Sequence, residues 1–210
     1  SRRKGARVER ANLTVIQHTD AEYLGFLEDH LEGRGVRFRY LRPHTGDDWA
    51  LALANPSDGA ILLGGGPWAS VSAPLLPSLQ AEVELARAYL ERDLPIIGMG
   101  LGAQILALAA GGSSEPAPLR LSVGEARRTR DDALSGHMPA RFLYVLYGRD
   151  RVVPPENATI LAVDENERAL AFQIGARALG FAGHPGMKTG MIEDICHGIR
   201  GHTRRHRGRA

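Results

Sequence analysis

Three short segments of the chain combine glycines with residues that could serve catalysis. The first, Pro95 to Gln104, reads Pro-Ile-Ile-Gly-Met-Gly-Leu-Gly-Ala-Gln and joins an apolar run to a stretch of helical composition. A strand that turns abruptly into a helix is the layout of a nucleophile elbow. The first backbone amides of such a helix have no partners within it and can stabilise an oxyanion. The central residue of this elbow is Gly100, which has no side chain.

The elbow and two further segments resemble the class I glutamine amidotransferases. Gly98 to Gln104 is similar to the family's Gly-x-Cys-x-Gly-x-Gln elbow, with Gly100 in the place of the cysteine. Leu63-Gly-Gly-Gly-Pro67 resembles the glycine-rich loop that helps to hold the oxyanion. Phe181-Ala-Gly-His-Pro-Gly186 resembles the terminal His-Pro-Glu segment. The resemblance extends over residues 13 to about 195 and is to the stand-alone branch related to the amidotransferase domain of GMP synthetase.

The resemblance implies a catalytic triad that this chain does not complete. In the family, the cysteine thiolate attacks the glutamine carboxamide, the histidine transfers the proton and the glutamate orients the histidine. Position by position, these residues become Gly100, His184 and Gly186. Two of the three positions have no functional side chain, so we expect no glutaminase activity. Glycine also relieves the backbone strain of such a turn, which is on the order of 1 kcal/mol.

The resemblance also implies a pocket at the elbow, with backbone amides arranged like an oxyanion hole. We expect its wall to come from Gly65, Gly66, Leu101, Gln104 and His184. We expect its rim to come from Trp68, Tyr147 and Arg149. In a related branch a His-Gly-Asp precedes the next strand, and Tyr147-Gly148-Arg149 takes that place here. We expect no cofactor and no metal ion.

Two features of this pocket have alternative interpretations. His184 could be an acid–base group beside Tyr147, Arg149 or Lys188, or a hydrogen-bonded remnant at a strand end; we favour the remnant, because no orienting carboxylate follows it. The loop of Gly64 to Gly66 could bind an anion through its amides or could be the turn that the fold requires, which we favour. Trp68 could cover the pocket or anchor the loop.

Cys196 is the only cysteine, so the chain cannot form an internal disulfide. Its spacing places it on the inner face of a last helix, where we expect core packing rather than a displaced nucleophile. A metal site could be imagined from Cys196 with His197, His202 and His206. The arginines among these histidines would repel a cation, so we do not expect one.

The elements around the elbow are predicted from hydrophobic patterns. Short apolar or alternating runs indicate strands at 13–16, 36–40, 59–63 and 94–98, the second near a sheet edge. Helical spacing indicates helices over about 23–31, capped by Thr19 or Asp20, over 78–92 and from 101 onward. Further strands are indicated at 143–146, 159–163, 170–174 and 178–182, with a last helix at 187–199. This alternation predicts an open, mostly parallel central sheet with helices on both faces, a flavodoxin-like three-layer α/β sandwich.

Composition fits one globular domain between two basic tails. The chain has 210 residues, of which 43% are hydrophobic and 24% charged. Residues 1–10 contain five basic groups and residues 197–210 five arginines, which leaves 16 basic and 23 acidic groups in residues 11–196. We predict a domain over 12–199, with tails at 1–11 and 200–210. Such tails are usually solvated, and nothing beside the arginines resembles a nucleic-acid recognition motif.

Partner and compartment follow from the same observations. No run approaches the roughly 18 apolar residues of a membrane span, and no signal-peptide core follows the basic start, so we expect a cytoplasmic protein without membrane or nucleic-acid partners. In the family, the face around the active site docks on a synthetase. The resemblance therefore implies a protein partner, synthetase-like or another enzyme subunit, and a homo-oligomer remains open. Three functions stay under consideration: a non-catalytic subunit or scaffold of a multi-protein biosynthetic complex, an enzyme with a different reaction at His184, and a small-ligand or anion-binding module.

Overall fold

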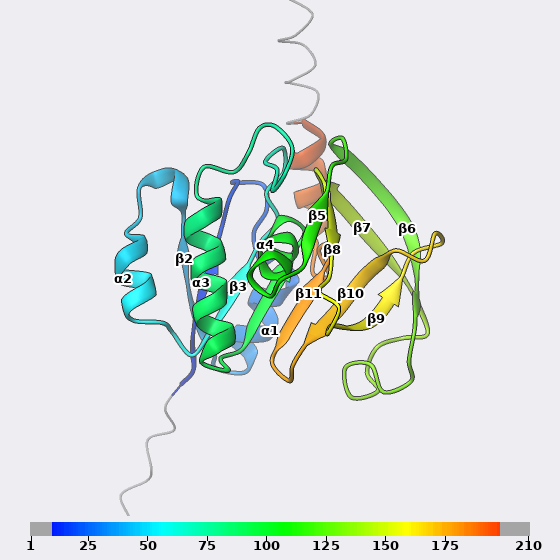
Figure 1. The fold of residues 1–210 in the computed structure, drawn as a ribbon, viewed down its shortest axis with the longest axis horizontal. Helices are drawn as coiled ribbons and strands as arrows, with labels where there is room; N and C mark the ends of the chain where they lie inside the picture. Colours follow the sequence, from blue (N-terminus) through cyan, green and yellow to red (C-terminus); the bar gives the residue numbers. More distant parts are fainter. Residues whose placement is uncertain (1–9, 198–210) are drawn as a thin grey trace, which may run out of the picture.

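A computed structural model describes residues 10–197 and contains a large mixed sheet in that part of the chain (Figure 1). Its parallel half consists of β1 (Asn12–Ile16), β2 (Arg37–Leu41), β3 (Gly59–Leu62), β4 (Ile96–Met99) and β11 (Ala178–Phe181). Its antiparallel half consists of β6 (Arg120–Arg128), β7 (Arg141–Gly148), β9 (Thr159–Val163) and β10 (Ala169–Ile174). The strand order is β2-β1-β3-β4-β11-β10-β9-β6-β7, so β4 and β11 lie at the centre.

Helices cover both faces of the parallel half, as the sequence predicted (Figure 1). They are α1 (Phe26–Gly33), α2 (Trp49–Ala54), α3 (Leu79–Glu91), α4 (Leu101–Ala109) and a helix over 189–197. Side chains alternate between the faces because successive strand residues point in opposite directions. Ile16 and Leu62 pack in the cluster that contains α3 and α4, whereas Val15 and Ile61 pack with Leu24 near α1. The three-layer α/β prediction is therefore confirmed.

The antiparallel half differs most from the pattern-based prediction. Residues 159–163 form β9 as expected, and β7 is longer at both ends than the predicted 143–146. The sequence analysis did not predict β6, α2 or the small sheet of β5 (Ser113–Glu115) and β8 (Arg151–Val153). Within residues 10–197, no helix has the length and apolar content needed to cross a bilayer.

The predicted start of the first helix was wrong. The helix begins at Phe26 rather than near Tyr23, because Gly25 at its N-cap has a φ of 62°, which ends any earlier helical run. The backbone amide of Leu24 donates instead to the hydroxyl of Tyr40, at 3.1 Å. Residues 20–25 therefore form an irregular connection after β1, which proves important for the candidate site.

The last helix carries the single cysteine. Met191 and Ile195 are its buried residues, and Cys196 beside them is only partly buried. The side chain thus lies at the margin of the core, less buried than expected. The remainder of the predicted helix to 199, both predicted tails apart from residues 10 and 11, and the histidines at 202 and 206 lie outside the described residues.

Candidate functional site

The elbow between β4 and α4 adopts the sharp turn that its glycines predicted. Gly100 is the N-cap of α4, with φ 54° and ψ −117°, a conformation that residues with a side chain rarely adopt. Its backbone amide donates to the carbonyl oxygen of Phe181 at 2.8 Å, which fixes the elbow to β11. A Cβ atom at position 100 would lie 3.3 Å from the Cα of Gly64, so the backbone angle constrains this position more than the space does.

The two flanking glycines serve a different purpose. A Cβ atom on Gly98 would lie 2.4 Å from the carbonyl oxygen of Gly102, and one on Gly102 would lie 2.0 Å from that of Leu62. Both distances are impossible for real atoms, so these glycines permit the close packing of α4 against β3 and β4. The first-turn amides of Gly102 and Ala103 bond to carbonyl oxygens of Leu63 and Gly100. Among the described residues, the Leu101 amide has no such acceptor.

His184 lies in the loop after β11 and is bound to backbone on both sides of its ring. Its Nε2 lies 2.6 Å from the carbonyl oxygen of Tyr23, and its Nδ1 lies 3.0 Å from the backbone nitrogen of Gly186. Because the Gly186 nitrogen is a donor, Nδ1 accepts and Nε2 carries the proton that it donates to Tyr23. Burial lowers the pKa of His184 below its usual value, which keeps the ring neutral. This geometry agrees with the hydrogen-bonded remnant.

Gly186 is packed against the start of α1. Its carbonyl oxygen accepts from the Phe26 amide at 2.9 Å. A Cβ atom on Gly186 would lie 3.1 Å from Cγ of Leu27 and 3.2 Å from the carbonyl oxygen of Leu24. A longer acidic side chain at this position would therefore require residues 24–27 to move.

A buried carboxyl group that the sequence analysis missed lies behind the glycine-rich loop. Glu22 is 2% exposed, accepts from the hydroxyl of Thr19 at 3.1 Å and accepts from the amide of Gly66. Its Oε1 occupies the space beside Gly64, where an added Cβ would lie 2.1 Å away. Burial raises the pKa of Glu22 to about 7. The Gly66 amide is thus engaged inside the protein, which favours the structural interpretation of the loop over anion binding.

A second buried pair supports the same loop. His18 Nε2 lies 2.6 Å from Oε2 of Glu82, with both side chains inaccessible to solvent, and His18 Nδ1 contacts the carbonyl oxygen of Gly64 at 3.1 Å. Burial alone would lower the pKa of His18, but the charge of Glu82 and the hydrogen bond to it outweigh burial and raise it. This pair joins the end of β1 to the first turn of α3 beneath the glycine-rich loop.

A cavity of about 750 Å³ opens beside the elbow and extends over the antiparallel half of the sheet. It brings together most of the residues expected at the pocket, namely Gly66, Trp68, Gly100, Leu101, Gln104, Tyr147 and Arg149. Gly65 and His184 do not line it. An added Cβ on Gly65 would strike the Leu101 side chain at 2.1 Å, so this residue packs under the helix start.

Several of the polar groups expected at the pocket already form hydrogen bonds or ion pairs within the protein. Gln104 Oε1 accepts from the hydroxyl of Ser70 at 2.5 Å, and its Nε2 donates to the carbonyl oxygen of Arg149 at 2.9 Å. Arg149 Nε donates to the carbonyl oxygen of Pro67 at 2.8 Å. Lys188 lies 3.4 Å from Asp29 in an ion pair. Burial, then the charge of Glu22, raises the pKa of Tyr147 to about 12, so its hydroxyl stays protonated.

Asp150, the residue after the altered polar landmark, also lines the cavity. It is 2% exposed and its carboxylate accepts from the backbone amides of Ser70, Val71, Ser72 and Ala117, at 3.0 to 3.3 Å. The hydroxyl of Ser72 also donates to it at 2.5 Å. The sequence analysis stopped at Arg149 and missed this residue. Within residues 10–197, no cluster of three or more His, Cys, Asp or Glu side chains could hold a metal ion.

Comparison with known proteins places the chain in a family. The model described as glutamine amidotransferase class-I matches residues 18–190. The chain therefore belongs to the class I glutamine amidotransferases.

The relatives include GMP synthases. The glutamine-hydrolyzing GMP synthase of Thermomicrobium roseum is 38% identical over 112 residues, which cover 51% of this chain and 20% of that protein. A protein named as one subunit of the glutamine-hydrolyzing GMP synthase of Ignicoccus hospitalis is 29% identical over 139 residues, which cover 63% of this chain and 66% of that protein. The chain thus spans a fifth of the first relative and just under two thirds of the second.

Solved structures share the fold. A glutamine amidotransferase from Thermotoga maritima superposes with a TM-score of 0.80 at 22% identity, covering 94% of this chain and 86% of that one. A glutamine amidotransferase from Methylobacillus flagellatus has the same TM-score at 23% identity, covering 90% of this chain and 75% of that one. At such identities the likeness concerns the fold alone.

Proposed function

We propose that this protein is a catalytically inactive class I glutamine amidotransferase that acts in the cytoplasm as a non-catalytic subunit or scaffold of a multi-protein biosynthetic complex. The observation that carries the proposal is the state of His184, whose two ring nitrogens are both bound to backbone groups, of Tyr23 and Gly186. Glutamine hydrolysis by this class requires a thiolate and an imidazole free to exchange its proton. Neither group is available at these positions.

The packing around position 186 supports the same proposal. An orienting carboxylate there would require Leu24 and Leu27 to shift by a few tenths of an ångström, since atoms of these residues lie 3.1 to 3.2 Å from the site of its first carbon. The elbow nevertheless keeps its sharp turn at Gly100, so the backbone that usually presents a nucleophile is intact while the side chains are absent. A retained scaffold without reactive groups fits a role in assembly better than a role in chemistry.

We infer a protein partner from the relatives. One of them is named as a subunit of GMP synthase, and we extend to this chain the idea of an enzyme partner of synthetase type. A homo-oligomer remains the alternative assembly.

The cavity favours a second candidate function, the binding of a small ligand. Its volume of about 750 Å³ lies within the range of small-molecule pockets, roughly 300–1,000 Å³. A different reaction at His184 receives no comparable support. Arg149 donates to the carbonyl oxygen of Pro67, and Lys188 forms an ion pair with Asp29. The raised pKa of Tyr147 keeps its hydroxyl protonated.

A glutaminase assay tests the loss of catalysis. We expect the purified full chain to release no glutamate from glutamine above a buffer blank. The Gly100→Cys variant should also remain inactive, because His184 cannot exchange its proton and no carboxylate orients it. Glutamate release by the unmodified protein that disappears in His184→Ala would overturn the proposal.

Purification with a mild affinity tag from the native host tests the assembly. A stoichiometric enzyme partner in a sample that is still without glutaminase activity would support the subunit role. A clean monomer or homo-oligomer would argue against it and in favour of ligand binding.

A further inference from the structure

The charges that line the cavity are balanced in number but not in pairing. Six arginines and six carboxylates contribute to its wall. Arg127 forms an ion pair with Glu167, and Arg141 forms one with Glu125. Two of the other carboxylates serve the backbone, since Asp150 binds the amides described above and Asp164 binds amides in its own turn. The remaining arginines are therefore less neutralised than the count suggests.

Arg120, the first residue of β6, contains a buried donor without a partner. Its Nη2 donates weakly to the backbone carbonyl of Asp150 at 3.4 Å. Its Nη1 is inaccessible to solvent and has no hydrogen-bond partner among the described residues. A buried guanidinium N–H without an acceptor is unfavourable and is rare in folded proteins. The guanidinium of Arg120, which lines the cavity, is therefore incompletely satisfied by the protein itself.

Two more arginines surround this donor. Burial, then the positive charges of Arg151 and Arg168, lowers the pKa of Arg120. Within residues 10–197, none of these three guanidinium groups has a carboxylate within 4.0 Å. Arg151 pairs in the small sheet with Glu115, yet their side chains form no ion pair. Three positive groups thus converge on one part of the cavity.

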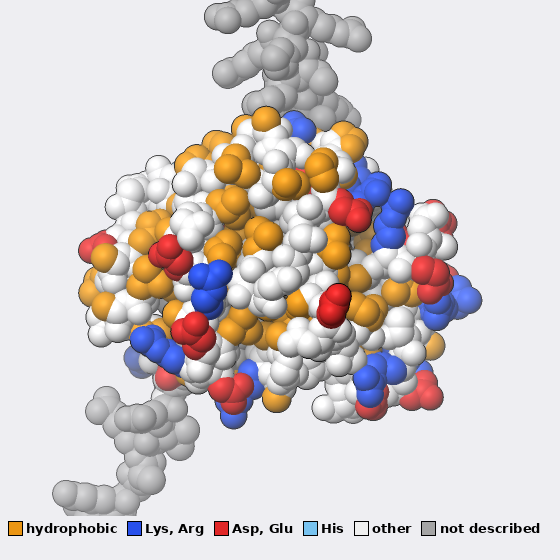
Figure 2. All heavy atoms as spheres, in the orientation of Figure 1, with side chains coloured by type: hydrophobic (Ala, Val, Ile, Leu, Met, Phe, Trp, Pro, Cys, Tyr) orange, Lys and Arg blue, Asp and Glu red, His pale blue; other side chains and the backbone are white. Residues whose placement is uncertain are grey.

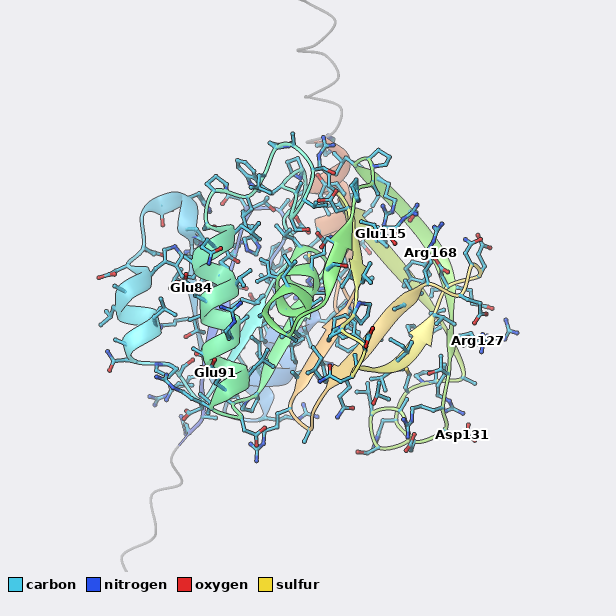
Figure 3. All side chains as sticks on the ribbon, viewed as in Figure 1. Glu84, Glu91, Glu115, Arg127, Asp131 and Arg168 are labelled. Atoms are coloured by element: carbon cyan, nitrogen blue, oxygen red, sulfur yellow. The ribbon has the colours of Figure 1, made fainter. Side chains whose placement is uncertain are left out.

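The figures place this part of the cavity on the antiparallel side of the molecule. Figure 3 labels Arg168 and Glu115 near the ends of β10 and β5, on the side of the molecule where β6 and β7 lie. Figure 2 shows basic atoms gathered over the same side, next to an acidic group.

We propose that Arg120, Arg151 and Arg168 bind an oxyanion group, phosphate or carboxylate, of a small-molecule ligand. Guanidinium groups recognise such planar or tetrahedral oxyanions through paired N–H bonds. Leu101, the first residue of α4, lines the same cavity, and the positive end of that helix adds to its attraction for an anion. Trp68 and Tyr144 provide ring surface along the wall for the rest of the ligand. This site does not depend on whether the protein is a complex subunit.

Calorimetric titration of the full chain tests the site, at constant ionic strength in chloride buffer. The probes are inorganic phosphate and sodium succinate in separate titrations, which distinguish a phosphate from a carboxylate preference. We expect saturable binding of at least one probe. Loss of a charged hydrogen bond in Arg120→Gln should raise the dissociation constant about tenfold.

A second variant and a control keep the test decisive. Arg168 is exposed, so Arg168→Gln should fold normally and also weaken binding, even if Arg120→Gln proves unstable. Arg87→Gln, an exposed arginine of α3 outside the cavity, should bind as the unmodified protein does. The proposal is overturned if neither probe saturates by concentrations on the order of 10 mM, or if Arg168→Gln binds as tightly as Arg87→Gln.

Discussion

His184 and Tyr23 are joined by a 2.6 Å hydrogen bond from the imidazole Nε2 to the backbone carbonyl oxygen. The bond ties the loop after β11 to the irregular connection before α1, across a sequence separation of 161 residues. A parallel bond, from the Phe26 amide to the Gly186 carbonyl, closes the same corner. His184 therefore acts here as a structural link between the two ends of the domain.

This link predicts a stability cost for removing the imidazole. His184→Ala should lower the free energy of unfolding by about 1–3 kcal/mol, because it leaves the Tyr23 carbonyl and the Gly186 amide without partners. Urea denaturation at pH 7 measures the change. His30→Ala, at an exposed position of α1, should change stability by less than about 0.5 kcal/mol. Equal effects of the two variants would contradict the structural role.

The same ring should titrate below its ordinary range. The folded-state pKa of His184 is lowered by burial, so the folded protein keeps the ring neutral where the unfolded chain becomes protonated. Its contribution to stability is thus present above pH 6.5 and is lost as the pH falls below that value. Nuclear magnetic resonance of labelled histidine should show a neutral ring with the proton on Nε2 at pH 7. A ring that titrates above pH 6.5 would contradict this assignment.

Glu22 predicts the opposite pH dependence. Its pKa is raised to about 7 in the folded protein from 4.5, so ionisation is disfavoured in the fold. Its stabilising contribution is complete below pH 4.5 and decreases as the pH rises to about 7, by about 3 kcal/mol in total. Glu22→Gln should remove this dependence and gain stability relative to the unmodified protein as the pH rises.

A matched control separates burial from the chemistry of the substitution. Glu84, labelled in Figure 3, is exposed on α3, and Glu84→Gln should leave the pH profile of unfolding unchanged. The comparison requires thermal or urea unfolding between pH 4.5 and pH 8. If Glu22→Gln and the unmodified protein keep a constant stability difference over that range, the raised pKa is wrong.

The sequence revealed the elbow but not the groups beneath it. Gly98, Gly100 and Gly102 act locally, through a backbone angle and close packing between neighbouring elements, so their spacing was sufficient to predict the turn. His18 meets Glu82 at a separation of 64 residues, and Asp150 meets Ser72 at 78. No local pattern records which polar residues will be buried together over such separations. β6 was missed for a related reason, since its apolar positions are interrupted by Gly124 and charged residues.

The buried pair of His18 and Glu82 predicts strong coupling between two distant elements. His18→Ala should cost about 3 kcal/mol or more, because it leaves the Glu82 carboxylate buried without its partner. The His18→Ala/Glu82→Ala double variant should lose less stability than the sum of the single variants. The stabilisation is complete below pH 6.5 and is lost as the pH rises through the raised pKa of His18.

The control for this cycle is an exposed pair. Arg127 and Glu167 form an ion pair at 2.6 Å with partly solvated side chains, and their coupling should stay below about 1 kcal/mol. Unfolding in urea at pH 6 measures all variants. A coupling between His18 and Glu82 no larger than that of the exposed pair would refute the structural importance of the buried one.

Loss of the Asp150 charge should loosen the backbone locally, around residues 70–72. Asp150→Asn keeps the shape of the side chain but removes the charge that binds the amides of Ser70, Val71 and Ser72. We expect a loss of at least about 2 kcal/mol, as charged hydrogen bonds of this kind contribute more than neutral ones. Hydrogen exchange should accelerate at these three amides more than in β1, and uniform acceleration would contradict the role.

The contact between Gly186 and the turn that opens α1 has a consequence for directed evolution. Gly25 has no room for a side chain while Gly186 remains in place, since an added Cβ on Gly25 would lie 2.3 Å from the Gly186 carbonyl oxygen. An added Cβ on Gly186 would instead crowd Leu27 and Leu24, at 3.1 and 3.2 Å. An acid at 186 thus requires small shifts of Leu24 and Leu27, and substitutions in residues 24–27 would relieve this crowding. Selection for glutaminase activity starting from this chain should recover substitutions in residues 24–27 before an acid at 186, because they relieve the crowding that the acid would meet.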